Sequence, residues 1–122
     1  MRGLGPLEAE IMERLWSWNR RVSVREIVDD LQRQRPVAYT TVKTVTDILH
    51  RKGLVHRVKD DRIWFYEPVG SREEFTAQLM HDVLDSGGDQ ERALSRFVRT
   101  ISPQELTALR RALAALEDED GR

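Results

Sequence analysis

The sequence predicts a mainly α-helical protein with one small β-hairpin, and three observations carry this prediction. Apolar residues recur at helical spacing along most of the 122 residues. A serine and a glutamate three residues apart form a capping box before one of these segments. Residues 54–66 are rich in β-forming side chains on both sides of a charged tight turn.

Three helices are expected in the N-terminal half, over residues 4–18, 23–34 and 39–52. Pro6 suits the first turn of the first helix, because proline needs no backbone N–H there. Ser23 begins the second helix as the cap whose hydroxyl accepts from the backbone of Glu26. Gly53 is a typical residue just past the end of a helix. The inner side of the third helix is expected to consist of Val42, Val45, Ile48 and Leu49.

Two short strands follow, and the chain then becomes helical again. The strands are predicted at 54–58 and 63–66, with the tight turn at 59–62. Helical spacing returns over 71–85 and again around 94–98, on either side of Gly87-Gly88. Ser102, Pro103 and Glu105 are typical of one more helix start, and the acidic residues 117–120 are expected to fray.

Composition excludes several classes of protein. With no cysteine, the chain has no disulfide, thiolate metal site or cysteine nucleophile. No signal peptide is evident, and no apolar run approaches the roughly 20 residues of a membrane helix, so we expect a cytoplasmic protein without a membrane partner. The three histidines, His50, His56 and His81, are too scattered to suggest a metal site. No phosphate loop or nucleophile elbow is present, so neither a cofactor nor an enzyme activity is expected.

The charge is distributed unevenly along the chain. Its formal net charge is −1, yet residues 33–62 contain eight basic residues against three acidic ones, a local net charge of +5. A basic segment on a nearly neutral chain favours an anionic partner bound at that segment. The same pattern is also found on ordinary solvated surfaces, so its position in the fold has to decide.

Three helices followed by a hairpin within about 65 residues have the order of a winged helix-turn-helix, a fold that places one helix in the major groove of DNA. Helix 39–52 would be the recognition helix and residues 54–67 the wing. Short threonine side chains allow close approach to base edges, while Lys and Arg bind phosphates or guanine. The expected DNA-binding residues are Thr40, Thr41, Lys43, Thr44, Arg51, Arg57, Lys59 and Arg62.

The winged helix is expected to occupy residues 1–69, and residues 70–122 are expected to form a helical dimerisation region. Leucines in the last helix recur at steps of three and four, the spacing of a coiled-coil seam. Short amphipathic helices of this kind need another surface to cover them, and a two-fold dimer would place two recognition helices on two half-sites. The expected dimerisation residues are Leu79, Leu94, Phe97, Leu106, Leu109, Leu113 and Leu116.

Other interpretations remain open at this stage. The threonine face could be an ordinary helix surface, and the leucines could fold back onto the winged helix instead of pairing with a second copy. A winged helix can also serve as a protein-interaction module or as part of a small-molecule-sensing regulator. The three tryptophans, Trp16, Trp18 and Trp64, are interpreted as core or core-edge residues.

Four segments together resemble one known family: LGPLEAEIMERLW, VSVREIVDDL, AYTTVKTVTDILHRKGLV and RIWFYEPV. The chain resembles the penicillinase-repressor (BlaI/MecI/CopY) family of winged-helix transcriptional regulators along nearly its whole length. The resemblance implies a homodimeric repressor that binds an inverted-repeat operator in double-stranded DNA. It also implies that Thr41, Lys43 and Thr44 match DNA-contact positions of the family.

Two departures from the family pattern concern how the repressor is released. In staphylococcal-type members a sensor protease prompts cleavage between an asparagine and a phenylalanine, whereas this chain has Arg96 before Phe97. The resemblance therefore leaves open whether a sensor protease or a ligand releases this protein. The copper-responsive branch has a C-terminal cysteine cluster, and a chain without cysteine cannot sense copper by that route.

Overall fold

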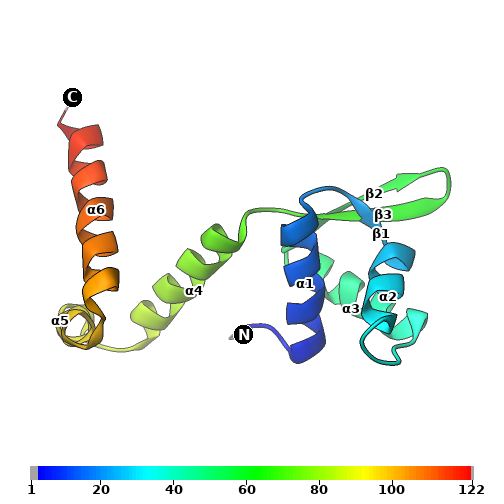
Figure 1. Ribbon diagram of the computed structural model, residues 1–122, viewed down its shortest axis with the longest axis horizontal. Helices are drawn as coiled ribbons and strands as arrows, with labels where there is room; N and C mark the ends of the chain where they lie inside the picture. Colours follow the sequence, from blue (N-terminus) through cyan, green and yellow to red (C-terminus); the bar gives the residue numbers. More distant parts are fainter. Residues whose placement is uncertain (1–2, 122) are drawn as a thin grey trace. The chain divides into compact units, whose positions relative to one another are not determined.

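The computed structural model describes residues 3–121, which form two compact units divided after Met80. The first unit contains three helices, a small sheet and the first part of a fourth helix, and the second contains helices without strands among its described residues (Figure 1). The predicted mainly α-helical fold class with a small β-hairpin is confirmed. The elements of the N-terminal unit are α1 (Pro6–Trp18), β1 (Val22–Ser23), α2 (Val24–Gln32), α3 (Tyr39–Arg51), β2 (Val55–Asp60) and β3 (Ile63–Pro68).

Local sequence signals determine where the first three helices begin and end. Glu8 accepts a hydrogen bond from the backbone N–H of Gly5 at 2.9 Å, and Pro6 lies in the first turn of α1. Ser23 forms the predicted capping box: its Oγ accepts from the backbone of Glu26 at 3.3 Å, and Glu26 accepts from the backbone of Ser23 at 2.9 Å. These contacts satisfy backbone donors that a helix start would otherwise leave unpaired.

Gly53 ends α3 as predicted. Its φ of +80° lies in the left-handed region, which glycine adopts without a steric penalty. The N–H of Gly53 donates to the carbonyl of His50, and the N–H of Leu54 donates to the carbonyl of Leu49, both at 3.0 Å. These two hydrogen bonds together form a Schellman motif, which turns the chain directly from α3 into the wing.

The sheet has three antiparallel strands in the order β1-β3-β2. Both predicted strands are present and run longer than expected, so the turn is reduced to Asp61 and Arg62. These two residues have φ values of +48° and +66°, as a two-residue turn of type I′ requires. The two-residue strand β1, which pairs Val22 with Tyr66, was not predicted. The hairpin β2–β3 projects beyond α1, α2 and α3 (Figure 1).

The core of the N-terminal unit lies between its helices and the sheet. Its fully buried side chains are Ile11, Met12, Leu15, Val22, Ile27, Val28, Leu31, Val42, Leu49 and Tyr66. The predicted inner side of α3 is partly wrong: Thr46 is buried at 1% exposure, whereas Val45 and Ile48 are only half-buried. Thr46 can be buried because its hydroxyl donates to the carbonyl of Lys43 at 2.8 Å. The three tryptophans pack at the edge of this core, as predicted.

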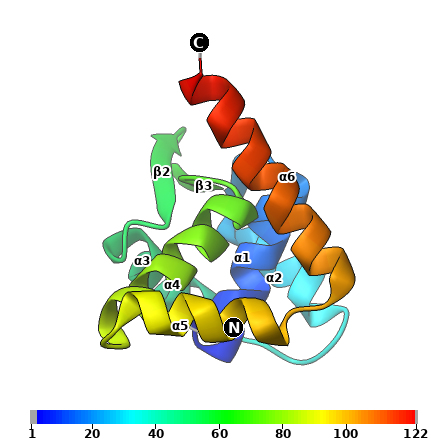
Figure 2. The same cartoon turned by 90° about the vertical axis from the view of Figure 1, so that its left-hand side faces the viewer.

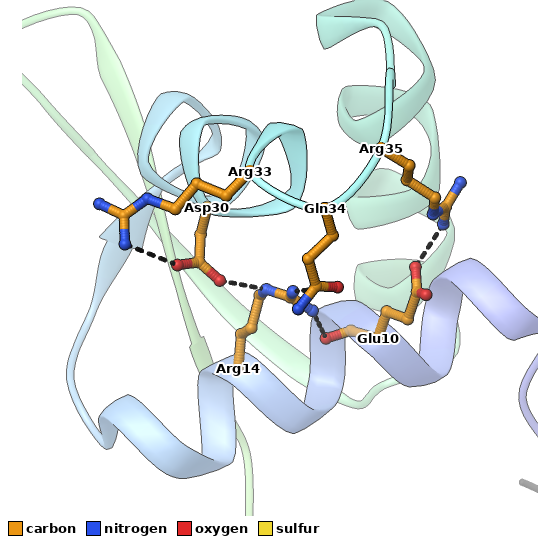
Figure 3. A network of polar contacts seen from close by, with 6 residues as sticks. All are labelled: Glu10, Arg14, Asp30, Arg33, Gln34 and Arg35. Carbon is orange, nitrogen blue, oxygen red and sulfur yellow. Dashed lines mark hydrogen bonds and ion pairs between the residues drawn. The ribbon is translucent and has the colours of Figure 1, made fainter.

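A polar network fixes α1 against the segment between α2 and α3 (Figure 3). Arg14 of α1 donates from Nε to Asp30 at 2.6 Å, and it donates again to the carbonyl of Glu10 at 3.0 Å. Arg35 pairs with Glu10, and Arg33 lies 3.8 Å from Asp30. Because α3 begins four residues after Arg35, this network helps to set where α3 starts.

Three further helices follow the sheet: α4 (Arg72–Ser86), α5 (Gln90–Thr100) and α6 (Pro103–Asp120). The first half of α4 belongs to the N-terminal unit, where Phe75 packs against Trp16 with ring centroids 5.4 Å apart. The predicted domain boundary at 69/70 therefore falls just before α4, whereas the division between the compact units falls within it.

In the C-terminal unit, the chain turns sharply between α5 and α6 (Figure 2). Ser102 caps α6 with the predicted box, accepting from the backbone of Glu105 at 3.1 Å. The expectation that residues 117–120 fray is wrong, because α6 continues to Asp120. Leucine, alanine and glutamate, which are good helix formers, make up most of its last two turns and support this length.

Candidate nucleic-acid interface

The first two turns of α3 present short polar side chains to solvent. Thr40, Thr41 and Thr44 are all exposed. The Thr44 hydroxyl donates to the carbonyl of Thr40 at 2.9 Å, so its hydrogen is already engaged and its oxygen remains available as an acceptor. The first turn has no acidic residue, which leaves the positive end of the helix dipole uncompensated. This end of α3 can therefore come close to a polyanion.

Lys43, on the same helix, is held by neighbouring side chains. Its Nζ lies 2.7 Å from Oδ1 of Asp47, one turn later on α3, and 3.2 Å from the hydroxyl of Tyr66 on β3. The Tyr66 hydroxyl also donates to Asp47 Oδ1 at 3.0 Å, and Arg57 of β2 approaches the same oxygen at 3.5 Å. We call these four residues the α3–wing clamp, since they join α3 to both strands of the wing.

The clamp keeps its charges at neutral pH. Burial by itself would raise the pKa of Asp47, but hydrogen bonds from Lys43 and Tyr66 and the charges of Lys43 and Arg57 outweigh it and lower that pKa. Burial by itself would lower the pKa of Lys43, but its hydrogen bonds to Asp47 and Tyr66 raise that pKa. The carboxylate and the ammonium therefore both remain ionised over the physiological range.

Two of the predicted cations, Arg57 and Lys59, lie on the same face of the wing as the buried Tyr66 ring. Strand register pairs Arg57 with Tyr66 and Lys59 with Trp64, so these four side chains share one face of the hairpin. Arg57 lies 4.6 Å and Lys59 lies 5.5 Å from the centroid of the Trp64 ring. Such cation–π contacts restrain long side chains while leaving their charge available. The wing thus presents Arg57 and Lys59 in a defined direction.

The remaining two predicted cations are more open. Arg51 lies in the last turn of α3, and Arg62 lies in the turn at the tip of the wing; both are exposed. Within residues 3–121, neither of them has a carboxylate at ion-pair distance. Lys52, by contrast, pairs with Glu8 at 2.8 Å and so joins α3 to α1. Although Lys52 is next to Arg51 in the basic segment, its charge is already paired with a carboxylate of the protein.

A shallow groove of about 300 Å³ runs between the start of α3 and the tip of the wing. Only Lys43 and Arg62 among its lining residues were predicted as site residues. Of the others, Arg25 places its guanidinium 4.8 Å from the centroid of the Tyr39 ring. The start of α2 therefore adds a cation to the surface formed by α3 and the wing. The groove is lined by Ser23, Val24, Arg25, Tyr39, Lys43, Arg62, Ile63 and Trp64.

The ion pair of the clamp could be predicted from the sequence, whereas the contribution of Tyr66 could not. Lys43 and Asp47 are four residues apart on a helix, the spacing of a favourable ion pair. Tyr66 is 23 residues away from Lys43, and only the tertiary packing of β3 against α3 brings its hydroxyl to this pair. The two cation–π contacts to Trp64 likewise depend on strand register.

The predicted dimerisation residues lie on α4, α5 and α6. Leu79 is half-buried on α4; on α5, Leu94 and Phe97 are 49% and 47% exposed. On α6, Leu106 and Leu109 are half-buried, whereas Leu113 and Leu116 are 53% and 54% exposed. Among residues 81–121, none is fully buried. The C-terminal unit of one chain therefore leaves much of its apolar surface in water.

Residues 3–121 contain no group of three or more His, Cys, Asp or Glu side chains placed to hold a metal ion. No helix within that range is both long and apolar enough to cross a membrane.

Comparison with known proteins identifies the family. The sequence profile described as "Penicillinase repressor" matches residues 4–115. The chain belongs to this family. The transcriptional regulator BlaI of Mycobacterium tuberculosis is 43% identical over 121 residues, covering 97% of this chain and 88% of that protein. The penicillinase repressor of Staphylococcus aureus is 26% identical over 107 residues, covering 84% of each chain.

Solved structures show a related fold. The adhesin competence repressor of Streptococcus pyogenes superimposes with a TM-score of 0.50 at 14% identity, covering 96% of this chain and 80% of that one. The YusO protein of Bacillus subtilis gives a TM-score of 0.50 at 18% identity, covering 95% and 76%. The predicted winged-helix fold and family are confirmed, as is the function class of a DNA-binding transcriptional repressor. This class is one of regulators and not of enzymes.

Proposed function

We propose that this member of the penicillinase repressor family binds an inverted-repeat operator as a homodimer and represses transcription in the cytoplasm. The observation that supports it most is the surface shared by α3 and the wing. Three exposed threonines lie on this surface together with three restrained cations. Asp47 holds Lys43 on α3, and the Trp64 ring holds Arg57 and Lys59 on the wing. Residues 1–69 would bind DNA and residues 70–122 would dimerise.

Each element has a separate task in this proposal. Thr40, Thr41 and Thr44 would lie near base edges in the major groove, where short side chains allow close approach and methyl groups can contact thymine. Lys43 would supply the donor directed at a base edge or an adjacent phosphate. The side chains expected to bind the DNA backbone, which fix position without reading sequence, are Arg51, Arg57, Lys59 and Arg62.

The C-terminal unit supports the dimer. Residues 81–121 bury no side chain fully, while α6 has leucines at steps of three and four along one side. Fully burying a leucine side chain stabilises the folded or associated state by roughly 1.5–3 kcal/mol. A second copy offers the same apolar surface, and a two-fold arrangement would present two α3 helices to a symmetric site. The predicted seven leucine and phenylalanine positions are the candidates for this contact.

Selection of duplexes from a random pool with the purified full chain would test the proposal. We expect an enriched inverted repeat with half-site centres about one DNA turn apart or slightly more. Binding should weaken steeply as salt rises, because phosphate contacts release counterions. Failure to shift any duplex in a salt-dependent way would contradict the proposal and favour a protein-interaction module.

A matched pair of variants on α6 tests the dimer. Leu113→Asp places a charge on the leucine seam, and Thr107→Asp places the same charge on the other side of the helix. We expect sedimentation velocity to show a monomer for L113D and a dimer for T107D. Operator affinity of L113D should fall about 100-fold or more, since joining two binding events raises affinity by roughly 10²–10⁴. A dimeric L113D would remove this seam from the proposed interface.

A sensor protease is proposed as a further partner. Phe97 is 47% exposed, but the Arg96–Phe97 bond lies inside α5 and lacks the asparagine of the staphylococcal pattern. A protease needs extended backbone, so α5 would have to unfold locally before cleavage. Because α5 is 11 residues long and buries no side chain, that opening would cost little.

A further inference from the structure

The α3–wing clamp places a carboxylate between two cations, one on the recognition helix and one on the wing. Three donors converge on one oxygen of Asp47: Lys43 from its own helix, Tyr66 from β3 and Arg57 from β2. A negative charge at this position repels DNA phosphates and by itself weakens binding. A carboxylate that weakens DNA binding at this position is expected to contribute to binding in some other way.

The geometry of the clamp indicates what that role is. Tyr66 is fully buried, so its hydroxyl is a rigid point on the floor of the surface. The side chains of Lys43, Asp47 and Arg57 are 31%, 38% and 33% exposed, so each of them remains in contact with solvent. A free lysine samples many rotamers, and fixing one of them on binding costs free energy. Asp47 and Tyr66 fix the Lys43 ammonium before DNA arrives.

We propose that Asp47 is a positioning residue for sequence recognition: it fixes Lys43 on the recognition helix and Arg57 on the wing in one arrangement. This inference rests on the proposed function. In this arrangement Lys43 can donate to a base edge in the correct register only when Arg57 meets the neighbouring backbone. Asp47 therefore lowers affinity for all DNA slightly and raises the preference for the operator.

The two effects have opposite signs, which makes them separable by experiment. The probes are a duplex selected by the wild-type full chain and a random duplex of the same length. Asp47→Asn removes the charge while keeping the shape. We expect D47N to bind the random duplex as tightly as wild type or more tightly, because a charge that repels phosphate is gone. The ratio of operator to random affinity should fall about tenfold, the scale of one lost base contact.

Two further variants isolate the mechanism. Asp60→Asn removes another carboxylate from the wing, 3.0 Å from Arg21 and outside the clamp. It should raise affinity for both duplexes equally and leave their ratio unchanged. Tyr66→Phe keeps the buried ring and removes the hydroxyl, and it should lower the ratio in the same direction as D47N. Thermal melting of each variant separates these effects from loss of folded protein.

A double-mutant cycle identifies whether Asp47 acts through Lys43. If it positions Lys43, the double variant K43A/D47N should have the same operator-to-random ratio as K43A alone. Additive losses would show that Asp47 reads a base directly and would overturn the inference, and so would an unchanged ratio in D47N. If wild type itself does not distinguish the two duplexes, the proposed function fails first.

Discussion

Lys59→Ala tests the placement of the wing on the DNA backbone. Lys59 lies on β2 beside the Trp64 ring, on the face that also carries Arg57. The proposed backbone contacts are four per protomer, or eight per dimer: Arg51, Arg57, Lys59 and Arg62. At roughly 0.9 per phosphate, the slope of log affinity against log salt should be about −7 for wild type. K59A removes one contact from each protomer, so its slope should be shallower by about 1.8.

This difference is large enough to measure. Between 50 and 200 mM salt, a slope of about −7 lowers affinity by roughly 10⁴, and the K59A dimer should lose about tenfold less over that range. Fluorescence anisotropy with labelled operator and random duplexes would give both slopes, and K59A should weaken both duplexes alike. Arg99→Ala, an exposed cation in the last turn of α5, is the matched control and should leave the slope unchanged. An unchanged slope in K59A would remove the wing from the backbone contacts.

Three other predictions concern stability and its relation to binding. Asp30→Asn should destabilise the fold by about 1 kcal/mol, because it uncouples Arg14 from α2, whereas Asp29→Asn next to it should cost less than about 0.5 kcal/mol; chemical denaturation would compare them. Burial by itself would raise the pKa of Glu8 and of Asp47, but hydrogen bonds outweigh it and lower both below their ordinary values of 4.5 and 3.8. The melting temperature should therefore hold from pH 7 to about 5 and fall at lower pH, first as Glu8 is protonated below about 4.5 and then as Asp47 is protonated below about 3.8. In Glu8→Gln that fall should be smaller, and an equal fall would exclude Glu8 as a cause. Arg62→Gly should raise stability by about 0.5–1 kcal/mol by relieving a positive φ, yet weaken DNA binding at low salt, while Arg62→Lys should preserve both properties.

Helix starts and ends were predictable because their signals are local. The Ser23–Glu26 box and the Gly53 stop each lie within four residues, and backbone hydrogen bonding leaves few alternatives to them. Strand β1 was missed for the opposite reason. Two residues carry no periodicity, and Val22–Ser23 becomes a strand only because β3 passes alongside it.

In the candidate interface, too, the local features were predictable and the tertiary contacts were not. Exposure of the threonines on α3 follows from helical period, and the basic residues of the wing follow from composition. Which cations are restrained could not be known from the sequence, because the restraining groups are distant in the chain. Tyr66 reaches Lys43 across 23 residues, and the exposed Lys52 pairs with Glu8 across 44 residues. A count of basic residues therefore overstated the availability of Lys52.

The residues of this surface depart from what stability alone would favour. Arg62 adopts a φ of +66°, although glycine is the usual residue at that position of such a turn. Asp47 brings a carboxylate among cations, and Val58 and Ile63 near the wing tip remain 46% and 49% exposed. Natural proteins retain locally unfavourable choices mainly where function requires them. These four departures lie on α3 and the wing, and this supports the proposal that this surface meets DNA.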